Sequence, residues 1–299
     1  VNFVMTSGNV YGESFHTAGN AVTINGDLNN TISGGRIHIR PTVKYDGIYF
    51  GGRSAVTVNN INNTISGGNI MLQCDASELD VGFHFGGGSN ANVKGNVTNK
   101  ITGGSFLPMD GAYTTTCNIY LGQYSGKIAG TLRNEISGGT FAASACSSRA
   151  YYFGARNPNA PIGKVVNVIG TKGSAEGPMF QAKPVYLAGG WAQLGTSTAY
   201  TAMPNVSQCS DTVTVSSTIH GGYFASSIYA GPTATASGTY YPFVIGSVQT
   251  DIYGGQIVGT FYAAASTAVY GKVTTNIYGG MIANVYGGGY DAVIYDGVE

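Results

Sequence analysis

A six-residue phrase recurs along this 299-residue chain and constrains its fold more than any other feature. The phrase is Asn or a small polar residue, a variable residue, Ile, a polar residue and Gly-Gly. From Ile32 to Ile65, Ile101 and Ile136 the steps are 33, 36 and 35 residues. A phrase repeated at this spacing indicates a stacked solenoid. Its copies begin at Asn30, Asn63, Asn99 and Asn134 and, more loosely, at Ser217, Thr250 and Thr275.

A degenerate copy divides the 83-residue gap between Ile136 and Ile219. It reads Asn167-Val168-Ile169-Gly170 and splits the gap into 33 and 50 residues. This copy keeps the asparagine and the isoleucine. On the sequence alone, Thr171-Lys172 stand where the other copies have Gly-Gly.

Each period also contains a second segment that is aromatic or aliphatic and ends in a small residue. Both segments are short, rich in β-branched and aromatic residues and bounded by glycine, which is typical of strands. No window shows a 3.6-residue apolar period, so we expect little helix. Strands that recur every 25 to 36 residues without a helical crossover must pair with their own copies in parallel. The copies of the second segment are 48–51, 83–86, 119–122, 151–154, 185–188 and 243–246.

The predicted fold class is therefore all-β, a single-stranded parallel β-helix of about eight to nine coils with projecting loops. Alternation along a strand assigns the faces. With the isoleucines inward, Asn30, Asn63, Asn99, Asn134 and Asn167 also point inward, two residues earlier. We interpret this asparagine column as structural, because stacked amides can satisfy one another inside a core.

The second segment predicts a column of rings. Tyr49, His84, Tyr120, Tyr152 and Tyr186 align at one position, each directly before an inward residue, so alternation places them outward. Five rings at the spacing of neighbouring strands would extend over roughly 19 Å. Such a stripe could stack on the sugar rings of an extended polysaccharide. The alternative is that the rings stabilise the sheet by stacking on one another.

Trp191 is the remaining candidate for carbohydrate binding. It opens the segment between Gly190 and Ile219, where the chain departs from the repeat, and solenoid insertions commonly carry recognition. A packed position under a loop is the alternative.

A second outward column precedes each Gly-Gly: Ser33, Ser66, Thr102, Ser137, His220, Tyr253 and Tyr278. Its last third is aromatic and is interpreted either as an adhesive end or as a stack.

Composition favours one exported domain over residues 1–299, since no compositional break divides the chain. Charged residues are 9% and the net charge is zero, which argues against nucleic acid as a partner. No run of 18 apolar residues predicts membrane insertion. Four cysteines fit a secreted or bacterial cell-surface location, with Cys74–Cys117 the favoured pairing and free thiols the alternative. The start at Val1 suggests a segment of a longer surface protein.

Enzyme motifs are absent from the sequence, so we assign no catalytic residue, no metal ligand and no cofactor; calcium remains possible without a motif. The acidic group nearest to a catalytic set is Asp75, Glu78 and Asp80, with Asp110 one coil further on. Basic candidates one coil earlier are His38, Arg40, Lys44 and Arg53, and His84 is a further basic partner. Whether the chain is an enzyme stays open at this point, with a non-catalytic role favoured.

The coil pattern resembles the right-handed, pectate-lyase-like parallel β-helices. That resemblance implies right-handed coils and allows a polysaccharide lyase or glycoside hydrolase, although no catalytic motif of that family is matched. The phrases at 252–255, 277–280 and 285–289 are also similar to those of repeat-built bacterial adhesins and surface proteins.

The first hypothesis is accordingly a non-catalytic extracellular binding or adhesion β-helix that recognises a neutral polysaccharide or cell-surface glycan. The second is a polysaccharide lyase or glycoside hydrolase. The third is a structural spacer in a surface fibre.

Overall fold

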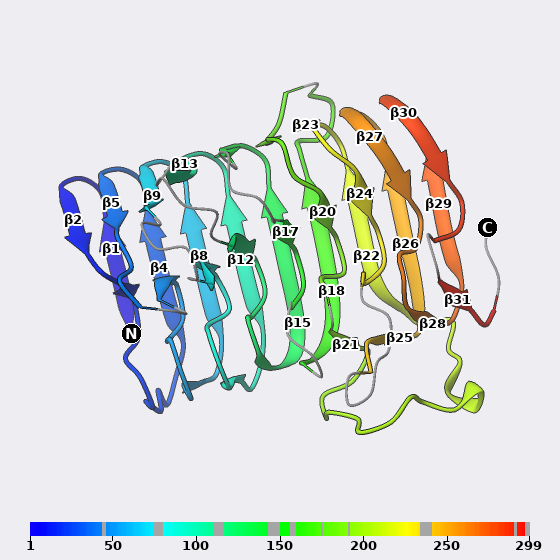
Figure 1. The fold of residues 1–299 in the computed structure, drawn as a ribbon, viewed down its shortest axis with the longest axis horizontal. Helices are drawn as coiled ribbons and strands as arrows, with labels where there is room; N and C mark the ends of the chain where they lie inside the picture. The colour runs from blue at the N-terminus through cyan, green and yellow to red at the C-terminus, as the bar shows by residue number, and fades with distance from the viewer. Residues whose placement is uncertain are drawn as a thin grey trace.

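The computed structural model describes residues 1–43, 46–73, 80–109, 116–142, 150–155, 160–174, 176–190, 192–233, 241–289 and 292–296. These residues form thirty-one strands and one short 3-10 helix, η1 (Val206–Gln208). The strands lie side by side in an elongated stack, with the amino terminus at one end and the carboxyl terminus at the other (Figure 1). Their pairings are parallel, which confirms the predicted all-β class and the parallel, solenoid-like arrangement.

The first sheet has fifteen strands in two ladders. One ladder carries the asparagine and isoleucine positions: β1 (Asn2–Met5), β4 (Leu28–Ile32), β8 (Ile61–Ile65), β12 (Val97–Ile101), β15 (Gly126–Ile136), β18 (Pro161–Ile169), β22 (Val213–Ile219), β26 (Ser247–Ile252) and β29 (Val273–Ile277). The other contains β7 (Thr57–Val58), β11 (Ala91–Val93), the beginnings of β15 and β18, β21 (Gln193–Leu194), β25 (Phe243–Ile245), β28 (Ala268–Tyr270) and β31 (Val293–Ile294).

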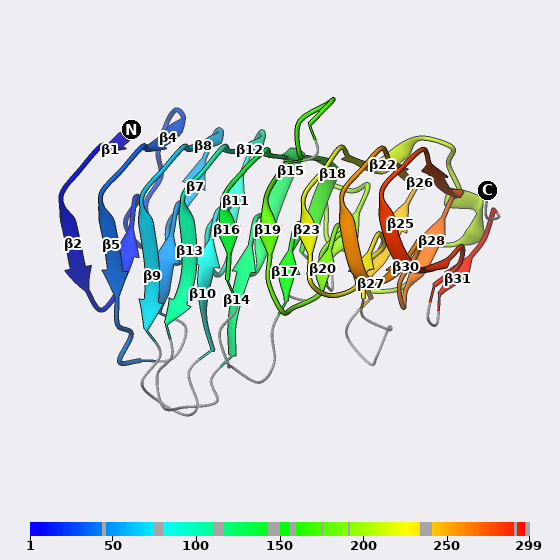
Figure 2. The ribbon, with the colours of Figure 1, turned by 90° about the horizontal axis from the view of Figure 1, so that it is seen from above.

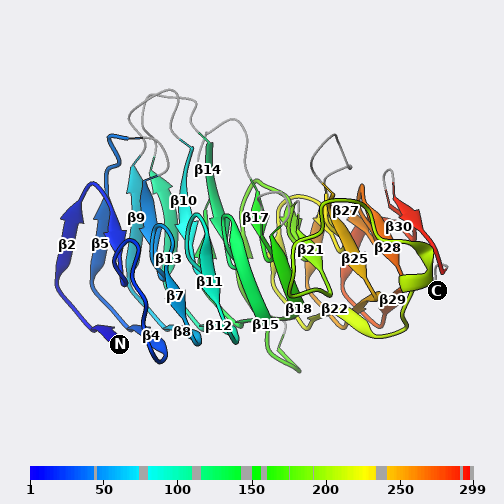
Figure 3. The same ribbon diagram turned by 90° about the horizontal axis from the view of Figure 1, so that it is seen from below.

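The second sheet has sixteen strands, again in two ladders, which β27 joins. One contains β2 (Asn9–Gly12), β5 (Arg36–Ile39), β9 (Asn69–Gln73), β13 (Ser105–Met109), β16 (Thr140–Phe141), β19 (Met179–Phe180), β23 (Tyr223–Phe224), β27 (Gln256–Tyr262) and β30 (Met281–Tyr286). The other contains β3 (Phe15–His16), β6 (Gly47–Tyr49), β10 (Asp80–His84), β14 (Thr116–Tyr120), β17 (Tyr151–Tyr152), β20 (Val185–Tyr186) and β24 (Ile228–Tyr229). Figures 2 and 3 show the stack from above and below.

The register between strands follows the repeat. Ile32 pairs with Ile65, Ile65 with Ile101 and Ile101 with Ile136, and these side chains are buried. The aromatic segments contribute the facing core layer, for example Phe50 and Phe85. Equivalent positions of successive copies therefore lie over one another, as the sequence predicted.

The inward asparagine column is confirmed. The amide of each asparagine from Asn30 to Asn134 donates to the side-chain oxygen of the asparagine in the next copy, at 2.7 to 2.9 Å. The same amide donates to a backbone carbonyl of the aromatic segment; for Asn99 this is the carbonyl of Leu121, at 2.7 Å. Asn167 ends the column by donating to Ser217 Oγ at 3.0 Å. Every amide thus links two copies and two faces of the core.

The Gly-Gly pairs form a corner between the two sheets, called the glycine corner below. The second glycine has a positive φ, +92° at Gly104, which favours glycine. At the first glycine the preceding copy approaches closely: a Cβ on Gly103 would lie 2.5 Å from the carbonyl oxygen of Ser66. Glycine is therefore needed in this pair for two different reasons.

The structure corrects the alignment of the degenerate copy. The amide of Gly170 donates to Ile136 O, as Ser137 does to Ile101 O, and the amide of Met179 donates to Gly139 O. Gly177 lies against the glycine pair of the next copy, since a Cβ on Gly177 would lie 2.8 Å from the backbone nitrogen of Gly222. In this copy Gly177 and Pro178 therefore stand where the other copies have Gly-Gly, because residues 171–176 are inserted before them.

Candidate functional site

The predicted ring column exists and is longer than expected. Pairings place His84 beside Tyr49 and Tyr120, and extend the column through Tyr152 and Tyr186. Four further rings belong to it: His16 before Tyr49, and Tyr229, Tyr262 and Tyr286 after Tyr186. The predicted register of the five rings is thus confirmed.

The predicted exposure of this column is wrong for its first three members. Tyr49, His84 and Tyr120 are at most 3% exposed. The rings of Tyr49 and His84 stack with centroids 4.4 Å apart and planes 5° apart, and those of Tyr120 and Tyr152 with centroids 5.4 Å apart. Since rings stacked along the axis cover one another's faces, they present no flat stripe to solvent.

Tyr152 and Tyr186, the remaining predicted binding residues of this column, are half-buried. Burial, together with the neighbouring Tyr152 and Tyr229, raises the pKa of the Tyr186 hydroxyl above its ordinary value. The Tyr186 phenol therefore stays neutral at physiological pH. A ligand role for the column stays a prediction, limited to ring edges and hydroxyls in its carboxyl-terminal part.

Several other predictions fall outside the described residues. These include Trp191, the pairing of Cys74 with Cys117, and the acidic candidates Asp75, Glu78 and Asp110. Cys209 is described and is an exposed free thiol. Of the basic candidates, His38 lies 3.1 Å from Gln73 through Nε2 and Oε1, and Arg53 pairs with Asp46. Among the residues that the structure describes, no three His, Cys, Asp or Glu side chains gather as a metal site would require.

Asp46, Arg53 and His16 form a small polar cluster at the amino-terminal end of the ring column. Arg53 Nη1 lies 3.1 Å from Asp46 Oδ1. Burial raises the pKa of the Asp46 carboxyl, an effect that Arg53 opposes. Burial, and secondarily Arg53, lowers the pKa of His16. A cavity of about 330 Å³ beside it is lined by Arg53, Tyr49, Asn20, Ala21, Ser54 and Ser89.

At the glycine corner the column before the glycine pairs is exposed at Ser33, Ser66 and Thr102 and becomes aromatic toward its carboxyl-terminal end. The column before the glycine pairs ends in His220, Tyr253 and Tyr278, which stack at 5.2 and 4.7 Å. Tyr253 and Tyr278 are exposed. The adhesive-end interpretation and the stack interpretation of this column are therefore compatible, because the rings stack and still reach solvent with their edges.

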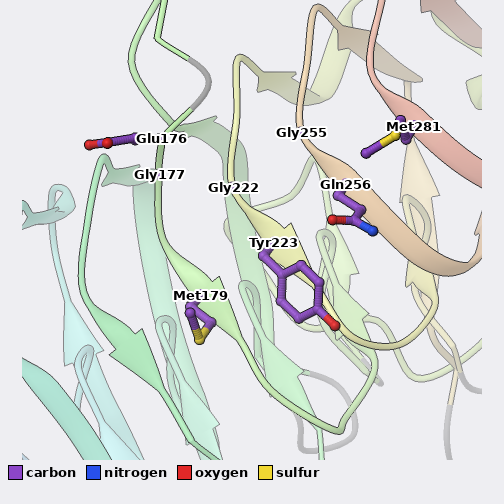
Figure 4. A pocket seen from close by; sticks show the side chains of 8 residues that line it. All are labelled: Glu176, Gly177, Met179, Gly222, Tyr223, Gly255, Gln256 and Met281. Carbon is purple, nitrogen blue, oxygen red and sulfur yellow. The ribbon is translucent and has the colours of Figure 1, made fainter.

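On the other side of the glycine pairs lies a cavity of about 510 Å³, called the corner groove below. Met179, Tyr223, Gln256 and Met281 line it from one column of successive strands. Gly222 and Gly255 also line it, as do Glu176, the last residue of the inserted segment, and Gly177, which follows that segment. Figure 4 shows Met179, Tyr223, Gln256 and Met281 in one row, with the Glu176 side chain pointing away from it. Met179, Tyr223 and Met281 are 39%, 37% and 64% exposed.

The groove is amphipathic. It offers two thioethers and a tyrosine ring beside an amide and a phenol, and Glu176 is the one charged side chain of its lining. The sequence reasoning missed the column of Met179, Tyr223, Gln256 and Met281. The signal was available for Tyr223, Gln256 and Met281, which follow Gly-Gly directly where earlier copies have Arg36, Asn69, Ser105 and Thr140; Met179 follows Pro178 and joins the column only through its pairing with Thr140.

Comparisons with known proteins add no relative: no family model, no curated protein and no solved structure matches the chain. Within the described residues, no helix has the length and apolar character needed to cross a bilayer.

Proposed function

We propose that the protein is a non-catalytic, extracellular binding or adhesion β-helix that recognises a neutral polysaccharide or cell-surface glycan in the corner groove. The observation that carries this proposal is the lining of the groove. A sugar ring has an apolar C–H face and a polar rim of hydroxyls. Met179, Tyr223 and Met281 suit the face, while the Tyr223 hydroxyl and Gln256 suit the rim.

The spacing of the groove supports an extended, repeating ligand. Its side chains come from four neighbouring strands, β19, β23, β27 and β30. At the usual separation of neighbouring strands the column extends over about 14 Å. A chain of sugar units can therefore meet a similar lining group at each strand. The neutral composition of the protein agrees with an uncharged ligand.

We extend the proposal to the finer description of the fold, a right-handed β-helix of about eight to nine coils in a protein secreted or displayed on a bacterial surface. The spacer hypothesis is favoured by one observation, the burial of Tyr49, His84 and Tyr120 in the stack. A stack of this kind serves the scaffold and is compatible with binding in the groove. For the lyase or hydrolase hypothesis the described residues offer one pair of neighbouring carboxylates, Glu13 and Asp46, and Asp46 is held by Arg53.

A glycan array tests the proposal. The array carries neutral glucans, mannans, xylans and galactans, with the wild-type protein compared with Tyr223→Ala/Gln256→Ala. We expect the wild type to bind at least one neutral glycan and the double variant to bind it about tenfold or more weakly, a change of about 1.4 kcal/mol. Tyr11→Ala is the matched control, because Tyr11 is also exposed but lies at the amino-terminal end. Retention of full affinity by the double variant would contradict the proposal.

A further inference from the structure

The inserted residues 171–176 interrupt the glycine corner at one place. In the preceding copy the step from Ile136 to Thr140 is four residues, whereas the step from Ile169 to Met179 is ten. The chain leaves the corner after Gly170 and returns at Gly177. Figures 1 and 2 both show the described residues of this segment, 171–174 and 176, in green, projecting from the body of the stack.

The projecting segment has hydrogen bonds of its own. The amide of Ser174 donates to the carbonyl of Thr171 at 3.0 Å, and the amide of Glu176 donates to Ser174 Oγ at 3.2 Å. Gly173 adopts a φ of +80° within it. These contacts define a turn that rises from the corner instead of lying along it.

The segment stands between two hollows. On its carboxyl-terminal side, Glu176 and Gly177 line the corner groove. On its amino-terminal side, Thr171 and Lys172 line a separate cavity of about 300 Å³, together with Lys100, Ser137 and His220. A ligand that runs along the corner through the groove therefore meets the inserted segment at one end.

We infer that the corner groove binds the end of a glycan chain and not its interior, with the segment 171–176 as the stop. This inference rests on the proposed function and adds the feature of the ligand that is recognised. The stop lies beside Met179 and Glu176, and the groove extends from there across Tyr223 and Gln256 to Met281 (Figure 4).

Glu176 is the charged group nearest to this end of the groove; its side chain is exposed and points away from the row of groove side chains in Figure 4, so it would turn toward a bound chain end. An ionised carboxylate accepts hydrogen bonds through both oxygens and donates none. A terminal sugar unit carries a free hydroxyl at the position where an internal unit is linked to its neighbour. A carboxylate at the closed end can therefore accept a hydrogen bond from that additional hydroxyl, and charge-assisted hydrogen bonds are the stronger kind.

Stoichiometry on a length series tests the inference. The probes are linear neutral oligosaccharides of four sugar units and polymers of the same linkage, drawn from the glycans that bind on the array. By isothermal titration we expect the wild type to saturate at one protein per recognised chain end, whatever the chain length. Several wild-type molecules bound along one polymer chain would overturn the inference and leave the proposed function intact.

Deletion of residues 171–176 gives the matched variant, since it joins Gly170 to Gly177 at the spacing of the other copies. We expect several molecules of this variant to bind along one polymer chain. One molecule per chain end for the deletion variant would overturn the role of the segment. Glu176→Gln, which keeps the segment, should bind the four-unit probe about tenfold more weakly at unchanged stoichiometry; unchanged affinity would remove Glu176 from the inference. If no neutral glycan binds the wild type, the proposed function fails, and the inference with it.

Discussion

In the amino-terminal half of the solenoid the inward position two residues before each core isoleucine is asparagine, and in the carboxyl-terminal half it is Ser217, Thr250 or Thr275. The asparagines form a continuous hydrogen-bonded column. The hydroxyls do not: Thr250 Oγ1 and Thr275 Oγ1 are buried without a hydrogen-bond partner in the described structure. One backbone repeat thus tolerates two different interior columns.

The two halves also differ in the columns that point away from the core, both in side-chain chemistry and in exposure. The ring column is buried at Tyr49, His84 and Tyr120 and reaches 56% exposure at Tyr286. At the glycine corner the amino-terminal copies carry Ser33, Ser66 and Thr102, whereas the later copies carry rings and thioethers. Within these columns Tyr49, His84 and Tyr120 are part of the scaffold, while Tyr253, Tyr278 and Tyr286 present their rings to solvent.

The largest expected effect concerns two members of the ring column. Tyr120→Ala should lower the free energy of unfolding by about 4 kcal/mol, because Tyr120 is fully buried and its removal leaves a cavity. Its hydroxyl also accepts a hydrogen bond from Asn118 Nδ2 at 2.7 Å. Tyr286→Ala, in the same column but exposed, should change it by about 0.5 kcal/mol or less. Urea unfolding followed by circular dichroism measures both; similar losses would break the comparison.

The second-largest expected effect on the free energy of unfolding concerns the interior columns. Asn99→Ala removes an amide that donates to Leu121 O and Asn134 Oδ1 and an oxygen that accepts from Asn63. Because it leaves buried polar groups unpaired, we expect the free energy of unfolding to fall by about 3 kcal/mol. Thr250→Val is the matched variant and should cost about 1 kcal/mol or less, since it removes a buried hydroxyl that has no partner among the described residues.

Hydrogen exchange of the backbone amides shows which strands each of these two substitutions destabilises. With Asn99→Ala, faster exchange should spread through the copies on either side, from β8 to β15, because the column connects them. With Thr250→Val, exchange should stay close to that of the wild type. Loss of protection of equal extent in the two variants would show that the asparagine column has no special structural role.

Much of the fold could be predicted from the sequence because its period and its alternation are strong. The step between isoleucines fixed which copies pair, and alternation placed the asparagines inside. The inserted segment was misaligned because the sequence offers Thr171-Lys172 directly after Gly170. Only the hydrogen bonds of Gly170 and Met179 show that the glycine position has moved to Gly177.

The candidate site was less predictable. Alternation predicts which side chains point away from the core, but it does not predict whether an outward ring is exposed to solvent. Tyr49, His84 and Tyr120 point away from the core and are nevertheless buried. Ring stacking along the axis also depends on side-chain torsions that a repeat does not specify. The corner groove was not predicted because methionine and glutamine belong to no recognised motif, although Gln256 and Met281 both follow Gly-Gly directly.

The smallest effect concerns the polar cluster that only the amino-terminal half has beside its ring column, within the described residues. The pKa of His16 lies below 6.5 because burial and Arg53 disfavour its charged form, with Asp46 opposing more weakly. His16 Nε2 is buried without a partner in the described structure, and the ring lies edge-on against Tyr49 at 5.1 Å.

A lowered folded-state pKa contributes stability that is present above pH 6.5 and is lost as the pH falls through the folded-state pKa. Melting temperature should therefore decrease on acidification below pH 6.5 by less in His16→Gln than in the wild type. A nuclear magnetic resonance titration of His16 measures the pKa directly, and a midpoint at or above 6.5 would contradict the expected direction.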